Sequence, residues 1–168
     1  PVLTKIVLNR FQKMCDGIIF LSKYTKENFE NTSTLKKCTY HLIYHPSYDH
    51  EKNFMPMIGK RDFLKLGMIG KQDAYKDPER GLTWFQNSKN PNIKLKLAGK
   101  LMANDHQLWE KFLTLDSNKS EIANTRLSDD ELIQAIHDCD FALLPYKGIA
   151  NSGMALLILS CGRPIITS

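Results

Sequence analysis

The segment Tyr146–Ser168 reads Y-K-G-I-A-N-S-G-M-A-L-L-I-L-S-C-G-R-P-I-I-T-S, and it carries the clearest fold signal in the chain. It follows the short apolar run Phe141–Leu144, whose length is typical of a buried parallel strand. Asn151 or Ser152 can cap a helix beginning at Gly153, where a ligand can approach the backbone closely. Because the unpaired N–H groups and the positive dipole end of a helix start attract anions, the segment predicts a buried helix that binds phosphate at its first turn.

The sequence upstream of this segment alternates between short apolar runs and longer amphipathic stretches from Asp62 onward. We expect strands over 63–69, 93–98, 121–123, 141–144 and 165–167, and helices over 78–86, 105–115, 129–137 and 153–160. The run Ser128-Asp129-Asp130-Glu131 is a capping box, which marks the start of the third of these helices. Such alternation predicts an α/β fold with a doubly wound parallel sheet and right-handed crossovers.

The N-terminal quarter of the chain has a different pattern. We expect a helix over 2–15, a strand over 17–21, a helix over 22–31 and a strand over 38–44, after which His45-Pro46 breaks the strand. The polar stretch that continues to Arg61 is interpreted as a linker or a domain crossing. Residues 1–45 are therefore predicted to end one domain and to cross into the next, which occupies residues 46–168. Because the chain starts at Pro1 and ends directly after a strand, we expect a piece of a longer protein, truncated at its C-terminal end.

The composition indicates an ordinary folded domain. Of the 168 residues, 42% are hydrophobic and 24% are charged, which is typical of globular proteins. No apolar run approaches the roughly 20 residues that a membrane-spanning helix needs. The net charge of +5 favours phosphorylated ligands, anionic lipid surfaces or nucleic acid, but the lysines are scattered along the chain, so we expect most of them to be solvated and no nucleic acid to bind.

The four cysteines, Cys15, Cys38, Cys139 and Cys161, are far apart in the sequence. Each is expected inside a helix or strand, so neither a zinc site nor a disulfide framework is indicated. They are interpreted as reduced core thiols of a cytosolic protein.

The candidate ligand-binding residues follow the strands, because an open parallel sheet binds ligands beyond the carboxyl ends of its strands. After the first of these strands, the loop Gly70–Lys76 offers one glycine for close approach, and Lys71 and Lys76 are suited to a diphosphate. The loop is neither a dinucleotide-binding fingerprint nor a Walker loop, and an ordinary turn with two exposed lysines is the alternative. For the turn around Ser152, the alternative is a helix cap without a ligand.

Other polar residues are weaker candidates. The loops Gly99-Lys100 and Asn124–Leu127 fit ordinary turns, although backbone groups of the second could contact a flat base edge. His41 and His45 lie in a run that is expected to be extended, which argues against a metal site. Asp138 and Asp140 flank the amino end of a strand, so a structural role is expected for both rather than acid/base catalysis.

Four segments taken in order carry a resemblance to a known family: Gly70–Lys76, Ile93–Lys100, Ser128–Leu132 and Leu144–Thr167. They resemble the nucleotide-sugar-binding half of GT-B glycosyltransferases, specifically the family-four-like "glycosyl transferases group one". The resemblance covers Cys15–Ser168. It implies that residues 1–45 end the acceptor-side domain and form the crossing segment, and that residues 46–168 form a Rossmann-like donor domain.

The resemblance also implies which residues bind the donor. In the family, basic residues of the first donor-domain loop and the amides of a glycine-rich turn hold the donor's diphosphate. The matching positions in this sequence are Gly70, Lys71, Lys76, Asn151, Ser152, Gly153 and Met154. Many members also carry two glutamates around this turn and its helix, where this chain has Ile149 and Leu157. The contacts to sugar and ribose, and a retaining or inverting outcome, therefore stay open.

The expected function is transfer of a sugar from a nucleotide diphosphate sugar to a polysaccharide or glycolipid acceptor. The lysines and the amides would neutralise the leaving diphosphate without a metal or another cofactor. No residue here is assigned as the catalytic base, which belongs to the acceptor-side domain, so the piece alone is expected to be inactive. A cytoplasmic location is expected, and peripheral association with the inner face of the membrane stays open.

Two alternatives use the same fold. A GT-B sugar epimerase would need carboxylates in the cleft, and the sequence offers none that are evident. A non-catalytic α/β module would use the same sheet edge to bind a nucleotide or a phosphate.

Overall fold

The computed structural model describes residues 10, 13–32, 39–48, 54–56, 62–102, 106–148 and 151–167. The chain divides into two compact units, Pro1–Pro46 and Ser47–Ser168. The assignment of these units to the acceptor side and the donor side of an enzyme stays a prediction. The helix predicted over 2–15 lies largely outside the described residues.

The first unit contains a pair of parallel strands and one helix. These are β1 (Gly17–Phe20), α2 (Lys23–Thr32) and β2 (Thr39–Leu42). Ser22 begins the helix, because its Oγ accepts a hydrogen bond from the backbone N–H of Thr25 at 3.2 Å. The rings of Phe20, Phe29 and Tyr40 pack against one another with centroids 5.2 to 6.0 Å apart, and they join the helix to the strands.

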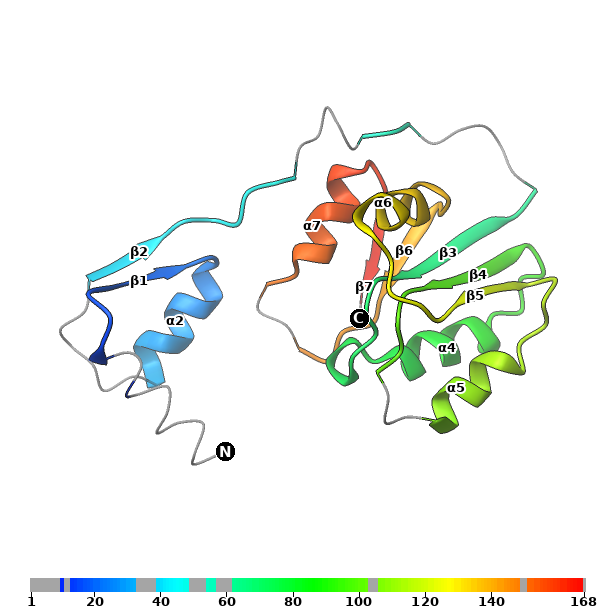
Figure 1. Cartoon of the computed structure of the whole chain (residues 1–168), viewed down its shortest axis with the longest axis horizontal. Helices are drawn as coiled ribbons and strands as arrows, with labels where there is room; N and C mark the ends of the chain where they lie inside the picture. The colour runs from blue at the N-terminus through cyan, green and yellow to red at the C-terminus, as the bar shows by residue number, and fades with distance from the viewer. Residues whose placement is uncertain are drawn as a thin grey trace. The chain divides into compact units, whose positions relative to one another are not determined.

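The second unit alternates strands and helices along the chain (Figure 1). Its elements are β3 (Leu64–Ile69), α4 (Pro78–Asn87), β4 (Ile93–Ala98), α5 (His106–Leu113), β5 (Ser120–Ala123), α6 (Asp129–His137), β6 (Phe141–Leu144), α7 (Gly153–Ser160) and β7 (Ile165–Thr167). The strands form one parallel five-stranded sheet in the order β5-β4-β3-β6-β7. The predicted doubly wound parallel sheet is therefore confirmed.

Helices cover both faces of this sheet, as Figure 1 shows. Successive residues of a strand point to opposite faces, so Met68 of β3 packs with α4 and α5 around Leu82 and Phe112. Its neighbour Ile69 packs with α6 and α7 around Ile136 and Ile158. The connections that follow β3 and β6 consequently leave the sheet towards opposite faces.

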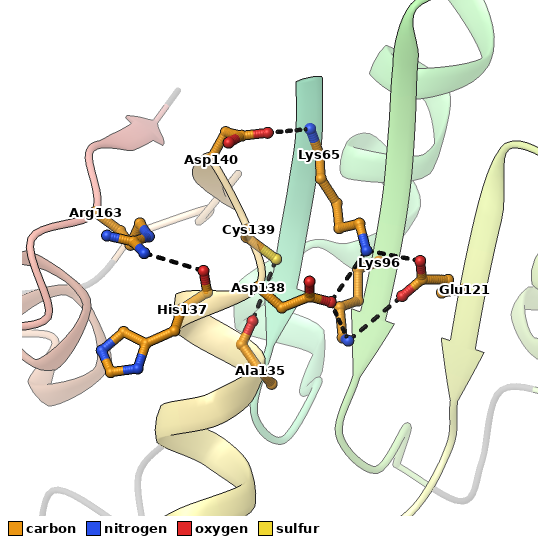
Figure 2. Close-up of polar contacts among 9 residues, drawn as sticks. All are labelled: Lys65, Lys96, Glu121, Ala135, His137, Asp138, Cys139, Asp140 and Arg163. Atoms are coloured by element: carbon orange, nitrogen blue, oxygen red, sulfur yellow. Dashed lines mark hydrogen bonds and ion pairs between the residues drawn. The ribbon is translucent and has the colours of Figure 1, made fainter. Parts of the chain in front are cut away.

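A charged cluster holds the amino edge of the sheet together (Figure 2). The ammonium of Lys65 lies 2.7 Å from a carboxylate oxygen of Glu121 and 3.0 Å from one of Asp138, and Lys96 lies 2.6 Å from the same oxygen of Asp138. Although burial opposes it, the hydrogen bonds from Lys96 and Lys65 hold the pKa of Asp138 below its ordinary value. The carboxylate of Asp140 accepts the backbone N–H of Lys65 at 2.7 Å. The structural role predicted for Asp138 and Asp140 is confirmed.

The cysteines are placed differently from the expectation. Cys139 and Cys161 are buried and form no disulfide, and Cys15 is half-buried. All three lie in turns or connections next to helices and strands, so the expected position inside an element is wrong for them. Cys38 lies outside the described residues. Among those residues, no helix is long and apolar enough to cross a bilayer.

At the carboxyl edge, the loops after β3 and β4 are in direct backbone contact. Gly70 donates its N–H to Ala98, Gln72 donates to Lys100, and Met102 donates to Gln72, at 2.8 to 3.1 Å. Gly99 has a φ of +141°, and a Cβ atom at this position would lie 2.2 Å from the carbonyl oxygen of Gly70. Only glycine permits this approach. Gly99, which follows β4, therefore allows the backbone of Gly70, which follows β3, to lie against it.

We predict that Gly99→Ala destabilises the protein by at least about 3 kcal/mol, because it adds a backbone clash to an unfavourable φ. Gly148→Ala is the matched control, since no atom lies within 4 Å of a Cβ atom added there. Its free energy of unfolding should stay within about 0.5 kcal/mol of the wild type. Urea denaturation followed by circular dichroism measures both, and equal midpoints for the two variants would contradict the described loop geometry.

Candidate functional site

The candidate site lies at the carboxyl edge of the sheet, where β3 and β6 are neighbours. The chain leaves β3 towards α4 on one face and leaves β6 towards α7 on the other (Figure 1). A crevice opens in an α/β sheet at such a point, and ligands bind there. All of the predicted site residues lie in these two connections or in the first turn of α7.

The first turn of α7 is capped by the side chain of Ser152. Ser152 has an extended backbone and its Oγ accepts the N–H of Ala155 at 3.1 Å, so it is the N-cap of this helix. The N–H groups of Gly153 and Met154 precede the first intrahelical hydrogen bond and point out of the helix end. They add to the positive end of the helix dipole and favour an anion.

Gly70 and Met154 are brought into contact across the crevice. Gly70 has a φ of +80°, and a Cβ atom there would lie 2.7 Å from the terminal methyl carbon of Met154. The same Cβ atom would lie 3.9 Å from a methyl group of Leu132 in α6. The loop after β3 therefore meets the side chain of Met154 closely, and the positive φ of Gly70 disfavours any residue with a side chain there.

Two tyrosines connect the loop after β3 to the Ser152 turn. The rings of Tyr75 and Tyr146 lie 5.9 Å apart between centroids, and Lys147 donates its backbone N–H to the carbonyl of Tyr75 at 2.9 Å. The hydroxyl of Ser152 donates to the hydroxyl of Tyr146 at 3.4 Å. Burial raises the pKa of Tyr146, so this hydroxyl stays protonated at neutral pH. Tyr146 therefore contacts both Tyr75, through its ring, and Ser152, through its hydroxyl.

The two predicted lysines have different surroundings. Lys76 ends the short 3-10 helix η1 (Ala74–Lys76) and is 7% exposed. Burial lowers its pKa, and within the described residues no carboxylate lies at ion-pair distance from its ammonium, which lies 6.0 Å from the ring centroid of Tyr75. Lys71 is exposed and forms an ion pair with Asp73 at 3.1 Å. Of the two lysines, Lys76 is therefore the one without an ion-pair partner among the described residues.

The structure thus joins some of the predicted residues directly. Gly70 contacts Met154, Ser152 is linked to the loop of Lys76 through the tyrosines, and Asn151 and Gly153 flank Ser152 in the chain. Their convergence on a single pyrophosphate stays a prediction. Among the described residues, no three or more histidine, cysteine, aspartate or glutamate side chains gather as metal ligands do.

Two pockets open at this edge, one towards each face of the sheet. The pocket towards α6 and α7 has a volume of about 420 Å³ and includes the predicted residues Gly153 and Met154, beside Leu157. The pocket towards α4 and α5 has a volume of about 510 Å³ and contains none of the predicted residues, although Gln72 and Asp73 of the same loop line it.

Sequence reasoning missed several residues of this edge. Tyr75 and Tyr146 have no local motif that would pair them. Asp77 is buried and left-handed, with a φ of 47°, and it forms ion pairs with Arg80 at 3.0 Å and Lys147 at 3.3 Å. The following Pro78 at the first position of α4 was a signal that Asp77 precedes a helix.

One residue of the weaker candidate loops has a clear structural role. The side chain of Asn124 accepts the backbone N–H of Leu101 at 2.8 Å. It therefore supports the loop after β4.

Several solved structures have a fold similar to that of this chain. No protein-family model matches the sequence, and no curated protein matches it significantly. The structure is similar to sucrose-phosphate synthase from Thermosynechococcus elongatus, with a TM-score of 0.71 and 16% identity, covering 96% of this chain and 43% of that one. It is similar to Anabaena HepE in complex with UDP and glucose, with a TM-score of 0.75 and 14% identity, covering 97% and 47%.

A third similar structure is a C-terminal domain alone. It belongs to the glycosyl transferase group 1 family protein LpcC from Francisella tularensis, with a TM-score of 0.52 and 14% identity, covering 73% of this chain and 66% of that one. The chain spans less than half the length of the first two structures. These similarities agree with the resemblance found in the sequence. The chain therefore has the α/β fold of the GT-B glycosyltransferases, and these similarities are consistent with a C-terminal half.

Proposed function

We propose that the chain is the donor-binding half of a glycosyltransferase, which moves a sugar from a nucleotide diphosphate sugar to a polysaccharide or glycolipid acceptor. The observation that carries this proposal is the contact between Gly70 and the side chain of Met154, because it brings the loop after β3 to the residues of the first turn of α7. The structure of HepE, to which the chain is similar, contains UDP and glucose. A cytoplasmic location belongs to the same proposal, with the membrane face included if the acceptor is a lipid.

The proposed role of these groups follows from the chemistry of sugar transfer. When the bond between the anomeric carbon and the diphosphate breaks, the electron pair stays on the diphosphate oxygen and its negative charge increases. The amides of Gly153 and Met154 and the ammonium of Lys76 would stabilise this charge, as fixed donors do at a site where charge develops. Because they bind the leaving group, they act at the bond-breaking step, whichever base activates the acceptor.

Lys76 is better suited to this role than Lys71. Its ammonium has no carboxylate partner among the described residues, whereas Lys71 would have to leave Asp73. Burial disfavours the charged form of Lys76 and lowers its pKa. A bound diphosphate restores a favourable environment for that charge, so binding and protonation of Lys76 are coupled.

We predict that one of UDP, GDP and ADP binds the chain saturably and that Lys76→Met weakens this binding roughly 10- to 100-fold, as expected for the loss of a charge-assisted hydrogen bond. Methionine keeps the length of the buried stem and removes the charge. Lys89→Met is the control, because Lys89 is exposed in the connection between α4 and β4. Isothermal titration calorimetry measures all three proteins. Indifference of the wild type to every nucleotide, or equal affinities of the two variants, would contradict the proposal.

We also predict that the affinity for the nucleotide falls as the pH rises through the lowered pKa of Lys76, because the neutral amine binds a diphosphate poorly. Lys76→Arg keeps its charge at every pH used, so its affinity should stay constant where that of the wild type falls. The measurement is calorimetry between about pH 8 and pH 10, at least about two units above the second phosphate pKa of about 6. Parallel pH profiles for the wild type and Lys76→Arg would assign the titration to another group.

A further inference from the structure

The polar stretch that the sequence indicates as a linker is attached to the end of α7. The backbone N–H of Tyr48 donates to the side-chain oxygen of Ser160 at 3.1 Å. The hydroxyl of Ser160 donates its own hydrogen to the carbonyl of Leu156, one turn earlier in the helix, at 2.8 Å. The oxygen is therefore held in place as an acceptor, and Tyr48 is bonded to the second unit.

A second attachment follows further along the same stretch. The ring of Phe54 packs against the backbone of Gly162, because a Cβ atom at residue 162 would lie 2.5 Å from Cε2 of this ring. Gly162 has a φ of +73°, so the turn after α7 requires a glycine and leaves room for the ring. The carbonyl of Met55 accepts a hydrogen bond from the guanidinium of Arg163 at 2.6 Å. Tyr48, Phe54 and Met55 are called the strap below.

Arg163 connects the strap to two helices. Its side chain is 3% exposed, and among the described residues no carboxylate lies at ion-pair distance from its guanidinium. The guanidinium donates instead to backbone carbonyls, at 2.6 Å to Met55, at 3.0 Å to His137 and at 3.4 Å to Gly162, and Figure 2 shows the bond to His137. His137 ends α6 and Gly162 follows α7, so the positive charge lies at the carboxyl ends of both helices, where it is favoured.

The bond between Arg163 and Met55 is the strongest attachment of the strap. Its donor is charged, and charge-assisted hydrogen bonds are shorter and stronger than neutral ones. The bond from Tyr48 to Ser160 joins two neutral groups. Removing the guanidinium should therefore release the strap more completely than removing the hydroxyl.

The strap also contributes to the pocket towards α6 and α7. Tyr48 lines this pocket together with Gly153 and Met154, which belong to the first turn of α7. Ser160, which holds Tyr48, is the last residue of the same helix. One helix therefore carries the candidate phosphate-binding amides at its start and the support of a pocket wall at its end.

We propose that Arg163 and Ser160 are positioning residues, which hold the strap on the second unit and thereby keep Tyr48 in place as a wall of the pocket beside the Ser152 turn. The strap moves together with α6 and α7, and its release opens the pocket without unfolding the sheet. The attachment of the strap depends on no ligand. Only its effect on nucleotide binding rests on the function proposed above.

The attachment is tested by NMR spectroscopy of the isotope-labelled chain. In the wild type, nuclear Overhauser effects should connect the ring protons of Phe54 to the α-protons of Gly162, and the amide of Tyr48 should be protected from hydrogen exchange. Arg163→Met removes the charged donors and keeps an unbranched apolar stem. It should abolish these Overhauser effects and accelerate the exchange of Tyr48 at least about tenfold, as expected for the loss of a charge-assisted hydrogen bond.

The core of the sheet distinguishes release of the strap from general destabilisation. The amides of Leu95 and Leu97 in β4 should keep their wild-type exchange rates in Arg163→Met, because the strap is not part of the sheet. Lys89→Met is the control and should leave all of these signals unchanged. Wild-type signals from the strap in a folded Arg163→Met variant would overturn the proposal, and so would equal acceleration at Tyr48 and Leu95.

Ser160→Ala provides a second variant, which decides the question if Arg163→Met does not fold. It removes the acceptor of the Tyr48 amide, and alanine is a better helix former than serine. The exchange of Tyr48 should accelerate at least about fivefold, as expected for the loss of a neutral hydrogen bond. An unchanged rate for Tyr48 in this variant would show that Ser160 does not hold the strap.

The effect on the pocket is measured by calorimetry with the nucleotide that binds the wild type. If the pocket wall is in place for only a fraction of the time, the apparent affinity falls by that fraction. Arg163→Met and Ser160→Ala should each weaken binding at least about threefold, and Lys89→Met should bind like the wild type. Wild-type affinity in both variants would refute the role of Tyr48 as a wall. Failure of every nucleotide to bind the wild type would contradict the proposed function instead, and the exchange rates would still decide whether Arg163 holds the strap.

Discussion

The pairing of β3 with β6 is the constraint on which the rest of this structure depends. Leu66 lies opposite Phe141 and Gly67 opposite Ala142 in this pairing. A Cβ atom on Gly67 would lie 2.5 Å from the sulfur of Cys139, so the turn before β6 reaches β3 only because residue 67 is glycine. The connection from β3 leads to β4 on one side, and the connection from β6 leads to β7 on the other side. Because crossovers between parallel strands are right-handed, these two connections lie on opposite faces of the sheet. The crevice at the carboxyl edge is a direct consequence.

The two edges of the sheet use charged residues in opposite ways. At the amino edge, Lys65 and Lys96 are each paired with Glu121 and Asp138, and the pKa values of both acids are lowered, by hydrogen bonds that outweigh burial. These charges are satisfied within the protein and join strands to a helix. At the carboxyl edge, the ammonium of Lys76 is buried without a carboxylate at ion-pair distance among the described residues. A satisfied cluster stabilises a fold, whereas an unsatisfied charge at a crevice is available to a ligand.

Local patterns in the sequence were sufficient to predict the elements of the second unit. The helix at 129–137 and the strand at 141–144 have the predicted bounds, because the capping box and the short apolar run are local signals. The sequence made no prediction for features that long-range contacts decide. The pairing of Tyr75 with Tyr146, the burial of Gln72 and the left-handed backbone of Asp77 depend on loops that are distant in the sequence.

The same distinction applies to the candidate site. The sequence indicated that Gly70 and Met154 belong to one edge, because both follow strands of a parallel sheet. It did not indicate their contact, or that Lys71 is paired with Asp73 while Lys76 is not. Those differences come from side-chain packing, which a periodic pattern does not encode.

The most direct measurement is the crystal structure of the chain with a bound nucleoside diphosphate. We predict that oxygens of the terminal phosphate lie about 2.7 to 3.2 Å from the amide nitrogens of Gly153 or Met154 and from the ammonium of Lys76. A diphosphate bound with neither α7 nor Lys76 in contact would contradict it.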